Sequence, residues 1–131
     1  MTPQIHHFGM IVMELEAHLS QSIWELKGDI VEDPLQQARL CMVGPVGSSE
    51  TPLVELVQPI GKDSPTYRAM RDAPGWHHVC LSVHDEAHAD HFAREAHMIP
   101  VTPWKPAVLF GGRAVRFFYS RQKELIEFLA H

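Results

Sequence analysis

Apolar and polar residues alternate in two stretches of the chain that match each other position by position. The first stretch is His6-His7-Phe8-Gly9-Met10-Ile11-Val12, and the second is His77-His78-Val79-Cys80-Leu81-Ser82-Val83. Both read His-His-apolar-small-apolar-x-Val, and alternation with a period of two predicts a β-strand. Each half of the chain therefore begins with the same strand, which indicates an internal repeat.

A helical pattern follows each of these two strands. Residues 14–27 carry Leu15, Leu19, Ile23 and Leu26 at helical spacing, and Gly28 follows as a helix stop. Residues 85–97 form the second pattern, with Asp85 as a candidate N-cap. The inward-facing residues expected in this second helix are Ala87, Phe92 and Ala96.

Short strand-like runs complete each half of the chain. They lie at residues 29–32, 38–43 and 53–57, and again at 99–101, 114–119 and 125–129. Each half is then strand-helix-strand-strand-strand, too small to bury its apolar face alone. We predict an α+β fold with two tandem βαβββ modules that form a curved mixed sheet around a concave cup. The chain is one domain, with module one at about 1–62, a linker at about 63–73 and module two at about 74–131.

A single carboxylate interrupts the apolar residues of one strand in each half. Glu55 lies between Val54 and Leu56, and Glu127 lies between Ile126 and Phe128. A carboxylate in the middle of a sheet is costly to bury unless a charged group meets it. The repeat thus gives each half one histidine and one glutamate at equivalent positions. We predict that His7, Glu55, His78 and Glu127 hold one divalent metal ion.

Two neutral imidazoles and two carboxylates form a charge-neutral site for a divalent cation. Mixed nitrogen and oxygen ligands suit Ni²⁺, Co²⁺, Mn²⁺, Fe²⁺ or Zn²⁺. The alternative is that these residues are ordinary polar groups satisfied by hydrogen bonds, which is the usual situation for one such residue alone. A rival ligand set, His84, His88 and His91, lies on one helix face but has no counterpart in the first half, which favours a solvated surface. Because His7/Glu55 and His78/Glu127 recur in the two halves, we favour these four residues as the ligands.

The composition restricts the classes of function. The chain has 131 residues, 45% of them apolar, and a formal net charge of −5 with no basic run. It therefore lacks the positive face that non-specific nucleic-acid binding needs. It shows no secretory signal or membrane-spanning run, so we expect a cytoplasmic protein with no membrane partner. Cys41 and Cys80 lie in apolar runs, as buried reduced thiols do.

The four ligand strands resemble those of the vicinal-oxygen-chelate superfamily. The matching runs are IHHFGMIV, PLVELVQPI, GWHHVCLSV and ELIEFLA. Within that superfamily, VELVQPIGKDSPTYRAMRDAPGWHHVCLSV and GGRAVRFFYS are similar to the methylmalonyl-CoA epimerase branch. The resemblance covers essentially the whole chain. It implies a homodimer and a metal-dependent isomerase that removes a proton next to a carbonyl of a small-molecule substrate such as an acyl thioester.

The same resemblance assigns roles to individual residues. Glu127 becomes a metal ligand that is also the candidate catalytic base, and Glu55 is the second catalytic carboxylate. Independently of the resemblance, the basic side chains that can contact an anionic substrate or carrier are Arg113, Arg116, Lys105 and Lys62. Each of these is otherwise an ordinary solvated charge.

The sequence departs from the epimerase pattern at one strand. Bacterial epimerases of this type carry a further glutamate on the strand before the second ligand, but residues 36–43 contain no carboxylate. Glu55 can replace it, as in a glyoxalase-like site. Two alternatives stay open: a glyoxalase I-like lyase, which shares the four ligands, and a non-catalytic protein that binds a small molecule such as an antibiotic. An extradiol dioxygenase fits less well, because Glu55 would fill a position that its iron keeps open.

Overall fold

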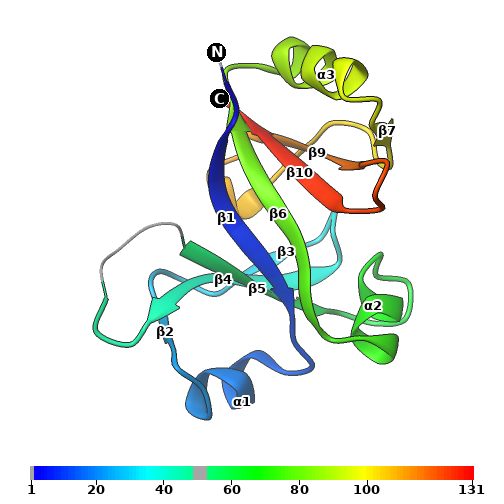
Figure 1. Ribbon diagram of the computed structural model, residues 1–131. Helices are drawn as coiled ribbons and strands as arrows, with labels where there is room; N and C mark the ends of the chain where they lie inside the picture. The colour runs from blue at the N-terminus through cyan, green and yellow to red at the C-terminus, as the bar shows by residue number, and fades with distance from the viewer. Residues whose placement is uncertain (1, 49–52) are drawn as a thin grey trace. The chain divides into compact units, whose positions relative to one another are not determined.

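Ten strands, three α-helices and one short 3-10 helix make up the computed structural model of the protein, which describes residues 2–48 and 53–131 (Figure 1). Parallel and antiparallel strand pairs both occur, so the sheet is mixed and the predicted α+β class is confirmed. None of the helices in the described part of the chain is long and apolar enough to span a bilayer.

The chain divides into two compact units. The first unit is His7–His77, and the second unit is Met1–His6 together with His78–His131. Two strands, β1 (Gln4–Ile11) and β6 (Gly75–Val83), contribute residues to both units. The boundaries between the units fall between the two histidines of each matching stretch, at His6/His7 and at His77/His78.

In the first unit, the strands lie in the order β2-β4-β5-β1, and β3 also pairs with β4. Strand β5 runs parallel to β1, and β4 runs antiparallel to its three neighbours. The sheet buries Cys41, Val43, Val54 and Leu56 on the side where Leu15 of the first helix packs. The further elements of the unit are α1 (Leu15–Ser20), β2 (Trp24–Leu26), β3 (Val31–Asp33), β4 (Ala38–Pro45), β5 (Leu53–Pro59) and α2 (Tyr67–Asp72).

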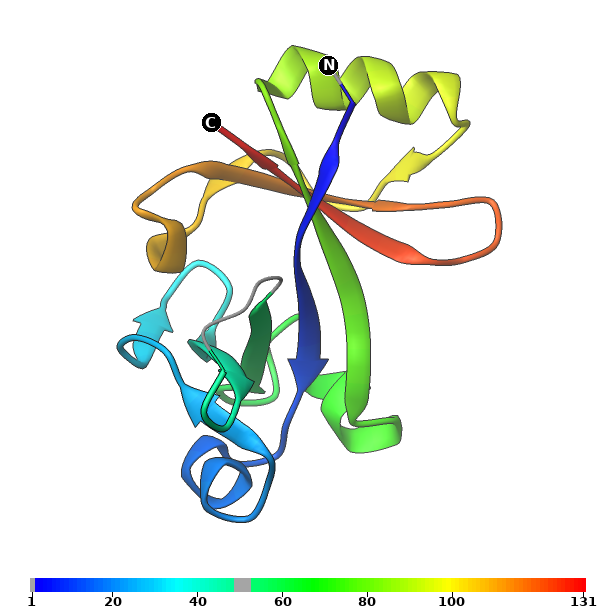
Figure 2. The ribbon, with the colours of Figure 1, turned by 60° about the vertical axis from the view of Figure 1, so that its left-hand side comes forward.

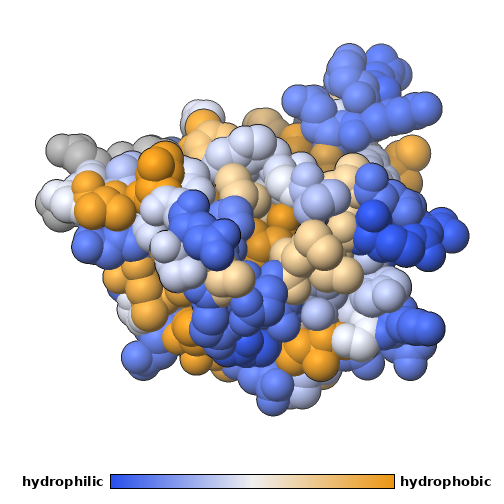
Figure 3. All heavy atoms as spheres, turned by 90° about the horizontal axis from the view of Figure 1, so that it is seen from below, coloured by the Kyte–Doolittle hydropathy of each residue, from blue (hydrophilic) through white to orange (hydrophobic). Residues whose placement is uncertain are grey.

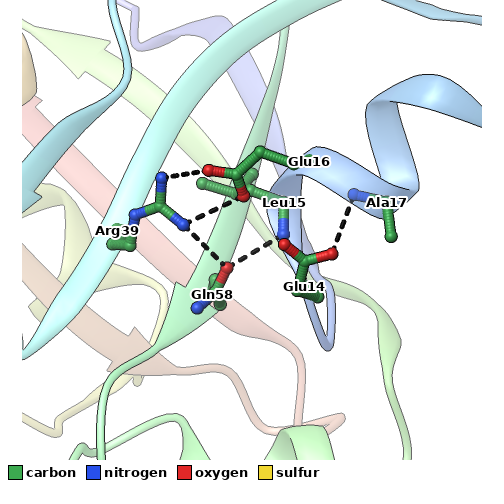
Figure 4. Close-up of polar contacts among 6 residues, drawn as sticks. All are labelled: Glu14, Leu15, Glu16, Ala17, Arg39 and Gln58. Carbon is green, nitrogen blue, oxygen red and sulfur yellow. Dashed lines mark hydrogen bonds and ion pairs between the residues drawn. The ribbon is translucent and has the colours of Figure 1, made fainter.

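Polar contacts fix the start of α1 against β4 and β5 (Figure 4). The Glu14 carboxylate accepts a hydrogen bond from the Ala17 amide at 2.9 Å, and the Leu15 amide donates to Gln58 Oε1 at 2.9 Å. The Arg39 guanidinium forms a two-pronged ion pair with Glu16. These contacts satisfy amide groups that the first turn of a helix leaves without an internal partner.

The helix predicted for residues 14–27 is wrong beyond Ser20. The Ser22 hydroxyl accepts a hydrogen bond from the Trp24 amide, and Trp24–Leu26 then forms β2 against β4. Ile23 is 64% exposed, so it does not continue the apolar side of a helix. Pairing with a neighbouring strand outweighs the weak helix preference of these residues, which include a β-branched and an aromatic side chain.

In the second unit, the strands lie in the order β6-β10-β9-β7, and β8 also pairs with β9. Strand β10 runs parallel to β6 and antiparallel to β9. Figure 2 shows α3 along one side of β9 and β10. The further elements of the unit are α3 (Glu86–Glu95), β7 (Ile99–Pro100), β8 (Lys105–Pro106), η1 (Val108–Phe110), β9 (Ala114–Tyr119) and β10 (Leu125–Ala130).

The N-cap predicted for α3 is confirmed, because the Asp85 carboxylate accepts a hydrogen bond from the His88 amide at 2.8 Å. The predicted inward face is wrong. Ala89 and Ala93 are buried instead, and Phe92 is 40% exposed. Two alanines spaced by one turn bring the helix backbone close to the sheet, where Phe118 and Phe128 fill the core.

Both cysteines are buried, as expected from the sequence. Burial raises the pKa of the Cys41 thiol to about 11, with a smaller contribution from the Glu55 carboxylate. Cys41 is therefore a thiol near neutral pH, and the thiolate is the reactive form of cysteine. Cys41 is therefore an unreactive residue of the hydrophobic core.

Candidate metal centre

The first unit places His7 and Glu55 on one face of neighbouring strands. Gly9, two residues after His7, lies directly opposite Glu55 in the parallel pairing of β1 and β5. Because side chains alternate along a strand, the two side chains project from the same face. His7 Nε2 lies 3.7 Å from Glu55 Oε1. Both residues are buried, at 0% and 5% exposure.

The second unit repeats this arrangement with His78 and Glu127. Cys80, two residues after His78, lies directly opposite Glu127 in the parallel pairing of β6 and β10. His78 Nε2 lies 3.4 Å from Glu127 Oε1. These residues are buried as well, at 8% and 3% exposure. The equivalence expected from the repeat thus extends to the strand register.

The nitrogen–oxygen separations in these two pairs can be compared with the spacing of two ligands around one cation. A direct hydrogen bond between nitrogen and oxygen has a length of about 2.7–3.2 Å, and both separations are longer. With metal–ligand bonds of about 2.1 Å, two ligands lie about 3.0 Å apart at right angles and about 3.4 Å apart at the tetrahedral angle. The 3.4 Å between His78 and Glu127 matches the tetrahedral value, and the 3.7 Å between His7 and Glu55 is wider than both values. The donor chemistry of both pairs suits a divalent cation.

Apolar residues surround the carboxylate in each unit. Met42 lies directly opposite Glu55 on β4, and buried Val57 and Ile11 continue the same face of the first unit. In the second unit, Phe117 lies directly opposite Glu127 on β9. The Phe117 ring stands perpendicular to the His78 ring, with centroids 5.2 Å apart. An ionised carboxylate in such surroundings loses hydration, and a nearby cation offsets that loss.

Two of the basic residues predicted to contact substrate lie on the same face of the second unit as Glu127. Lys105 is half-buried and lies directly opposite Val115 in the pairing of β8 and β9. Arg113 precedes β9 and has the same alternation as Val115. Its Nε donates a hydrogen bond to the Ala130 carbonyl at 3.0 Å, and its Nη2 atom is buried.

Arg116 lies on the other face of β9, because it is the neighbour of Phe117 in the strand. Its guanidinium pairs with Asp90 at 3.1 Å and donates to the Thr102 carbonyl at 2.7 Å. The same group lies 5.2 Å from the centre of the Phe118 ring. Arg116 thus connects α3 to the sheet. Lys62, in the first unit, is exposed.

The rival histidine set does not form a cluster of metal ligands in the described part of the chain. The His84 and His88 rings are 5.4 Å apart and perpendicular. His88 Nδ1 instead pairs with the Asp85 carboxylate at 2.8 Å, on the surface of the protein. This confirms the expectation of a solvated helix face at its first turn.

Three neighbours of the candidate ligands were missed by sequence reasoning: Met42, Cys80 and Phe117. They become visible only through the strand register. The register of β9 and β10 is set by the short turn between them. In this turn the Ser120 hydroxyl accepts a hydrogen bond from the Glu124 amide at 3.0 Å. Counting back from that turn places Phe117 opposite Glu127.

Comparison with known proteins gives structural relatives but no sequence relatives. No protein-family model matches the chain, and no curated protein matches it. A hypothetical protein from Bacillus halodurans C-125 has a similar structure, with a TM-score of 0.79, 19% identity, and coverage of 100% of this chain and 96% of that one. Methylmalonyl-CoA epimerase from Mycobacterium tuberculosis has a TM-score of 0.77 and 17% identity, with coverage of 97% and 87%. The chain has the vicinal-oxygen-chelate fold.

A second methylmalonyl-CoA epimerase, from Streptomyces coelicolor in complex with 2-nitronate-propionyl-CoA, also has a similar structure. Its TM-score is 0.76 at 17% identity, and the match covers 98% of this chain and 95% of that one. The resemblance inferred from the four strand motifs is thus confirmed at the level of the vicinal-oxygen-chelate fold. Sequence identities this low establish only the fold. The chemistry has to be inferred from the residues of the candidate site.

Proposed function

We propose that His7, Glu55, His78 and Glu127 together bind one divalent cation, and that the protein is an epimerase-like enzyme. The reaction we assign is removal of the proton next to the carbonyl of an acyl thioester, followed by addition of a proton to the same carbon. One observation carries the proposal: each unit presents a buried His/Glu pair in the same strand register, with Glu55 opposite Gly9 and Glu127 opposite Cys80.

The donor set supports a divalent ion of the first transition series. Two imidazole nitrogens and two carboxylate oxygens balance a charge of +2, so no further charge is buried. Such a set suits Co²⁺, Ni²⁺, Zn²⁺, Mn²⁺ or Fe²⁺, and the coordination number of the octahedral ions leaves room for substrate oxygens. Hard cations such as Mg²⁺, which favour oxygen ligands, are a poorer match.

Catalysis then depends on the two carboxylates. A bound divalent cation supplies positive charge that makes a proton next to a carbonyl more acidic. We assign Glu127 as the general base that takes the proton from the α-carbon. Glu55 passes a proton taken up from solvent to the opposite face of that carbon, and Glu127 then releases its own proton to solvent. Phe117 and Met42, beside these carboxylates, exclude water and so protect the deprotonated substrate.

The structural relatives support a thioester as the substrate class. Two of them are methylmalonyl-CoA epimerases, one bound to 2-nitronate-propionyl-CoA and the other bound to methylmalonyl-CoA. Lys105 and Arg113 are the basic residues we assign to the anionic part of such a substrate. By the same analogy we propose that the enzyme acts in the cytoplasm as a homodimer.

Exchange of the substrate's α-proton with solvent deuterium tests this function. The purified protein is loaded in turn with Co²⁺, Ni²⁺, Mn²⁺, Zn²⁺ and Fe²⁺ and incubated in D₂O with methylmalonyl-CoA and a panel of other 2-substituted acyl-CoAs. Exchange should need the metal and should fall strongly in Glu127→Gln. His88→Ala is the matched control, because His88 is an exposed histidine paired with a carboxylate outside the centre.

Absence of exchange over the whole panel with metal-loaded protein would overturn the enzymatic proposal. Turnover of the glutathione hemithioacetal of methylglyoxal without α-proton exchange would show a glyoxalase I-like lyase instead. Tight binding of a small hydrophobic molecule by a metal-free protein would show a sequestering function.

A further inference from the structure

The second unit carries an exposed apolar patch on the sheet face of Glu127. Phe117 lies directly opposite Glu127, and Tyr119 lies two residues further along β9. Ile99 lies directly opposite Tyr119 on β7, and the Val101 amide donates a hydrogen bond to the Phe117 carbonyl. Side chains that are two residues apart in a strand, or directly opposite in neighbouring strands, project from one face of a sheet. The apolar patch consists of Ile99, Val101, Phe117, Tyr119 and Leu125.

The apolar patch is accessible to a ligand. Ile99 is 68% exposed, Val101 is 46% exposed and Tyr119 is 45% exposed. Phe117 and Leu125 are half-buried. Helix α3 packs on the other face of this sheet, so it leaves the patch uncovered (Figure 2). A molecule bound at Glu127 can therefore extend over the patch without displacing the core.

Apolar side chains on another face of the molecule are arranged differently. Figure 3 views the molecule from the end at which α1 lies in Figure 1, and hydrophobic side chains reach that surface in separate groups between hydrophilic ones. Scattered apolar side chains are common on protein surfaces and need no ligand, whereas adjacent ones mark a binding surface. The five adjacent residues beside Glu127 are of the second kind.

Charge is distributed unevenly along this face of the second unit. Lys105 lies opposite Val115, which is two residues before Phe117 in β9. The apolar patch lies towards the other end of β9, around Tyr119, and none of its residues is charged. The charged residues of the turn at 121–124 come after the patch and are exposed. Val115 and Tyr119 are four residues apart, which is about 13 Å in a strand. A ligand that crosses this face thus meets a cation at one end and an apolar surface at the other.

We propose that the apolar patch binds the acyl group of the substrate, and that this group carries a large apolar substituent, such as a phenyl ring, in place of a second carboxylate. The inference rests on the proposed function, because that function puts the reacting carbon of an acyl thioester at Glu127. A substituent on that carbon then lies beside Phe117 and reaches Tyr119.

The chemistry of the patch favours such a substituent over an anionic one. A carboxylate placed against apolar side chains loses hydration, and the patch offers no cation in return. A phenyl or branched alkyl group instead removes apolar surface from water on both partners and can pack against the Phe117 and Tyr119 rings. The substrate class we assign therefore differs from methylmalonyl-CoA, which is bound to one of the structural relatives.

Isothermal titration calorimetry with two thioesters that differ in one substituent tests the proposal. 2-Phenylpropionyl-CoA has a phenyl group on the α-carbon where methylmalonyl-CoA has a carboxylate, and the two are otherwise the same. The metal-loaded wild type should bind the phenyl compound about tenfold more tightly or better, the value of burying one large apolar group.

Two variants locate this preference in the apolar patch. Ile99→Lys adds a positive charge, so the ratio of the two affinities should fall about tenfold, with weaker binding of the phenyl compound and tighter binding of methylmalonyl-CoA. Tyr119→Ala removes a ring without adding charge and should weaken binding of the phenyl compound alone, by about fivefold. Ile23→Lys is the matched control, because Ile23 is a similarly exposed isoleucine in the first unit. Its added charge attracts any CoA ester but should leave the ratio at the wild-type value.

Several results would overturn the proposal. One is equal or tighter binding of methylmalonyl-CoA by the wild type, and another is an equal fall of the ratio in Ile99→Lys and Ile23→Lys. A third is a wild-type dimer that becomes monomeric in Ile99→Lys with an unchanged ratio, since a second copy of the chain would then cover the patch.

The binding experiment is independent of turnover. A phenyl preference that Ile99→Lys removes, in a protein without α-proton exchange, would support the patch and refute the enzymatic function. Exchange with a higher kcat/KM for methylmalonyl-CoA than for 2-phenylpropionyl-CoA would refute the patch and leave the enzymatic function intact. Binding of neither thioester would refute both.

Discussion

The two halves of the molecule present the same pair of candidate ligands in different surroundings. In both, the residue two positions after the histidine lies directly opposite the glutamate in a parallel strand pair. That residue is Gly9 in the first unit and Cys80 in the second. On the other side of the glutamate lies Met42 in the first unit and Phe117 in the second. The two units thus share the ligand positions and differ in the groups beside them.

The surroundings make the second pair the more closely packed one. The Phe117 ring contacts the His78 ring edge-on, and the His78–Glu127 separation of 3.4 Å is shorter than the 3.7 Å between His7 and Glu55. The helices differ as well, since α3 has ten residues and α1 has six. A cavity of about 500 Å³ lies beside α1 in the first unit. The two units thus match in their candidate ligands and differ in the packing around them.

Loss of the two carboxylates should have the largest effect. We expect Glu127→Gln to lower the rate of α-proton exchange by about 10²–10⁴-fold, the range of a general base. Glu55→Gln should lower it by a similar factor if both carboxylates transfer protons. The exchange rate of each variant in D₂O, measured at matched metal content, separates the two roles. A Glu55→Gln enzyme with the wild-type exchange rate would leave Glu127 as the only base.

Truncation of one core residue in each unit should have the next largest effect. Phe128 and Leu56 are both fully buried, in the second and first unit respectively. We expect Phe128→Ala to lower the free energy of unfolding by about 3–5 kcal/mol and Leu56→Ala by about 2–5 kcal/mol. Urea denaturation followed by far-UV circular dichroism measures both. Two separate transitions in either variant would show that the units unfold independently.

Loss of a helix N-cap should have a smaller effect, and the fall in Tm should differ between the two units. Asp85 caps α3 and Glu14 caps α1, each through one amide hydrogen bond. Aspartate is a preferred N-cap and glutamate is not, so Asp85→Ala should lower the Tm by about 3–5 °C and Glu14→Ala by less. Differential scanning calorimetry of both variants measures this order. A larger fall in Glu14→Ala would contradict it.

The smallest effect concerns the ion pair between Glu16 and Arg39. The hydrogen bond from Arg39 lowers the pKa of Glu16 from 4.5 to about 2. Because the folded-state pKa is lowered, the pair stabilises the fold above pH 4.5 and loses this effect as the pH falls towards 2. NMR titration of the Glu16 carboxyl should show a return towards 4.5 in Arg39→Gln. An unchanged pKa in that variant would show that Arg39 does not hold the carboxylate.

The sequence predicted most of the strands, because each repeats an apolar pattern that has to face a core. Strand-like runs such as 38–43, 53–57 and 125–129 lie within β4, β5 and β10. Asp85 also marked the start of α3 correctly. The helical spacing of apolar residues in 21–27 led to a wrong helix prediction. These residues form β2 because they pair with β4, which lies far along the chain.

The candidate ligands were predictable for a related reason. A buried histidine or glutamate that recurs in both halves stands out from the apolar residues around it. The neighbours Met42 and Phe117 have no such signal, since an apolar residue in a strand is the expected case. Lys105 and Arg116 look alike in sequence, and only the pairing with Asp90 shows that Arg116 serves the packing of α3.

Metal content of the purified protein tests the central claim most directly. Plasma mass spectrometry after dialysis should find one divalent ion per chain in the wild type, and a large loss of that ion in His7→Ala and His78→Ala alike. Equal loss in the two variants means that each half contributes to the same ion. Retention of the full metal content by either variant, or a wild type that binds none under metal-replete conditions, would contradict the account.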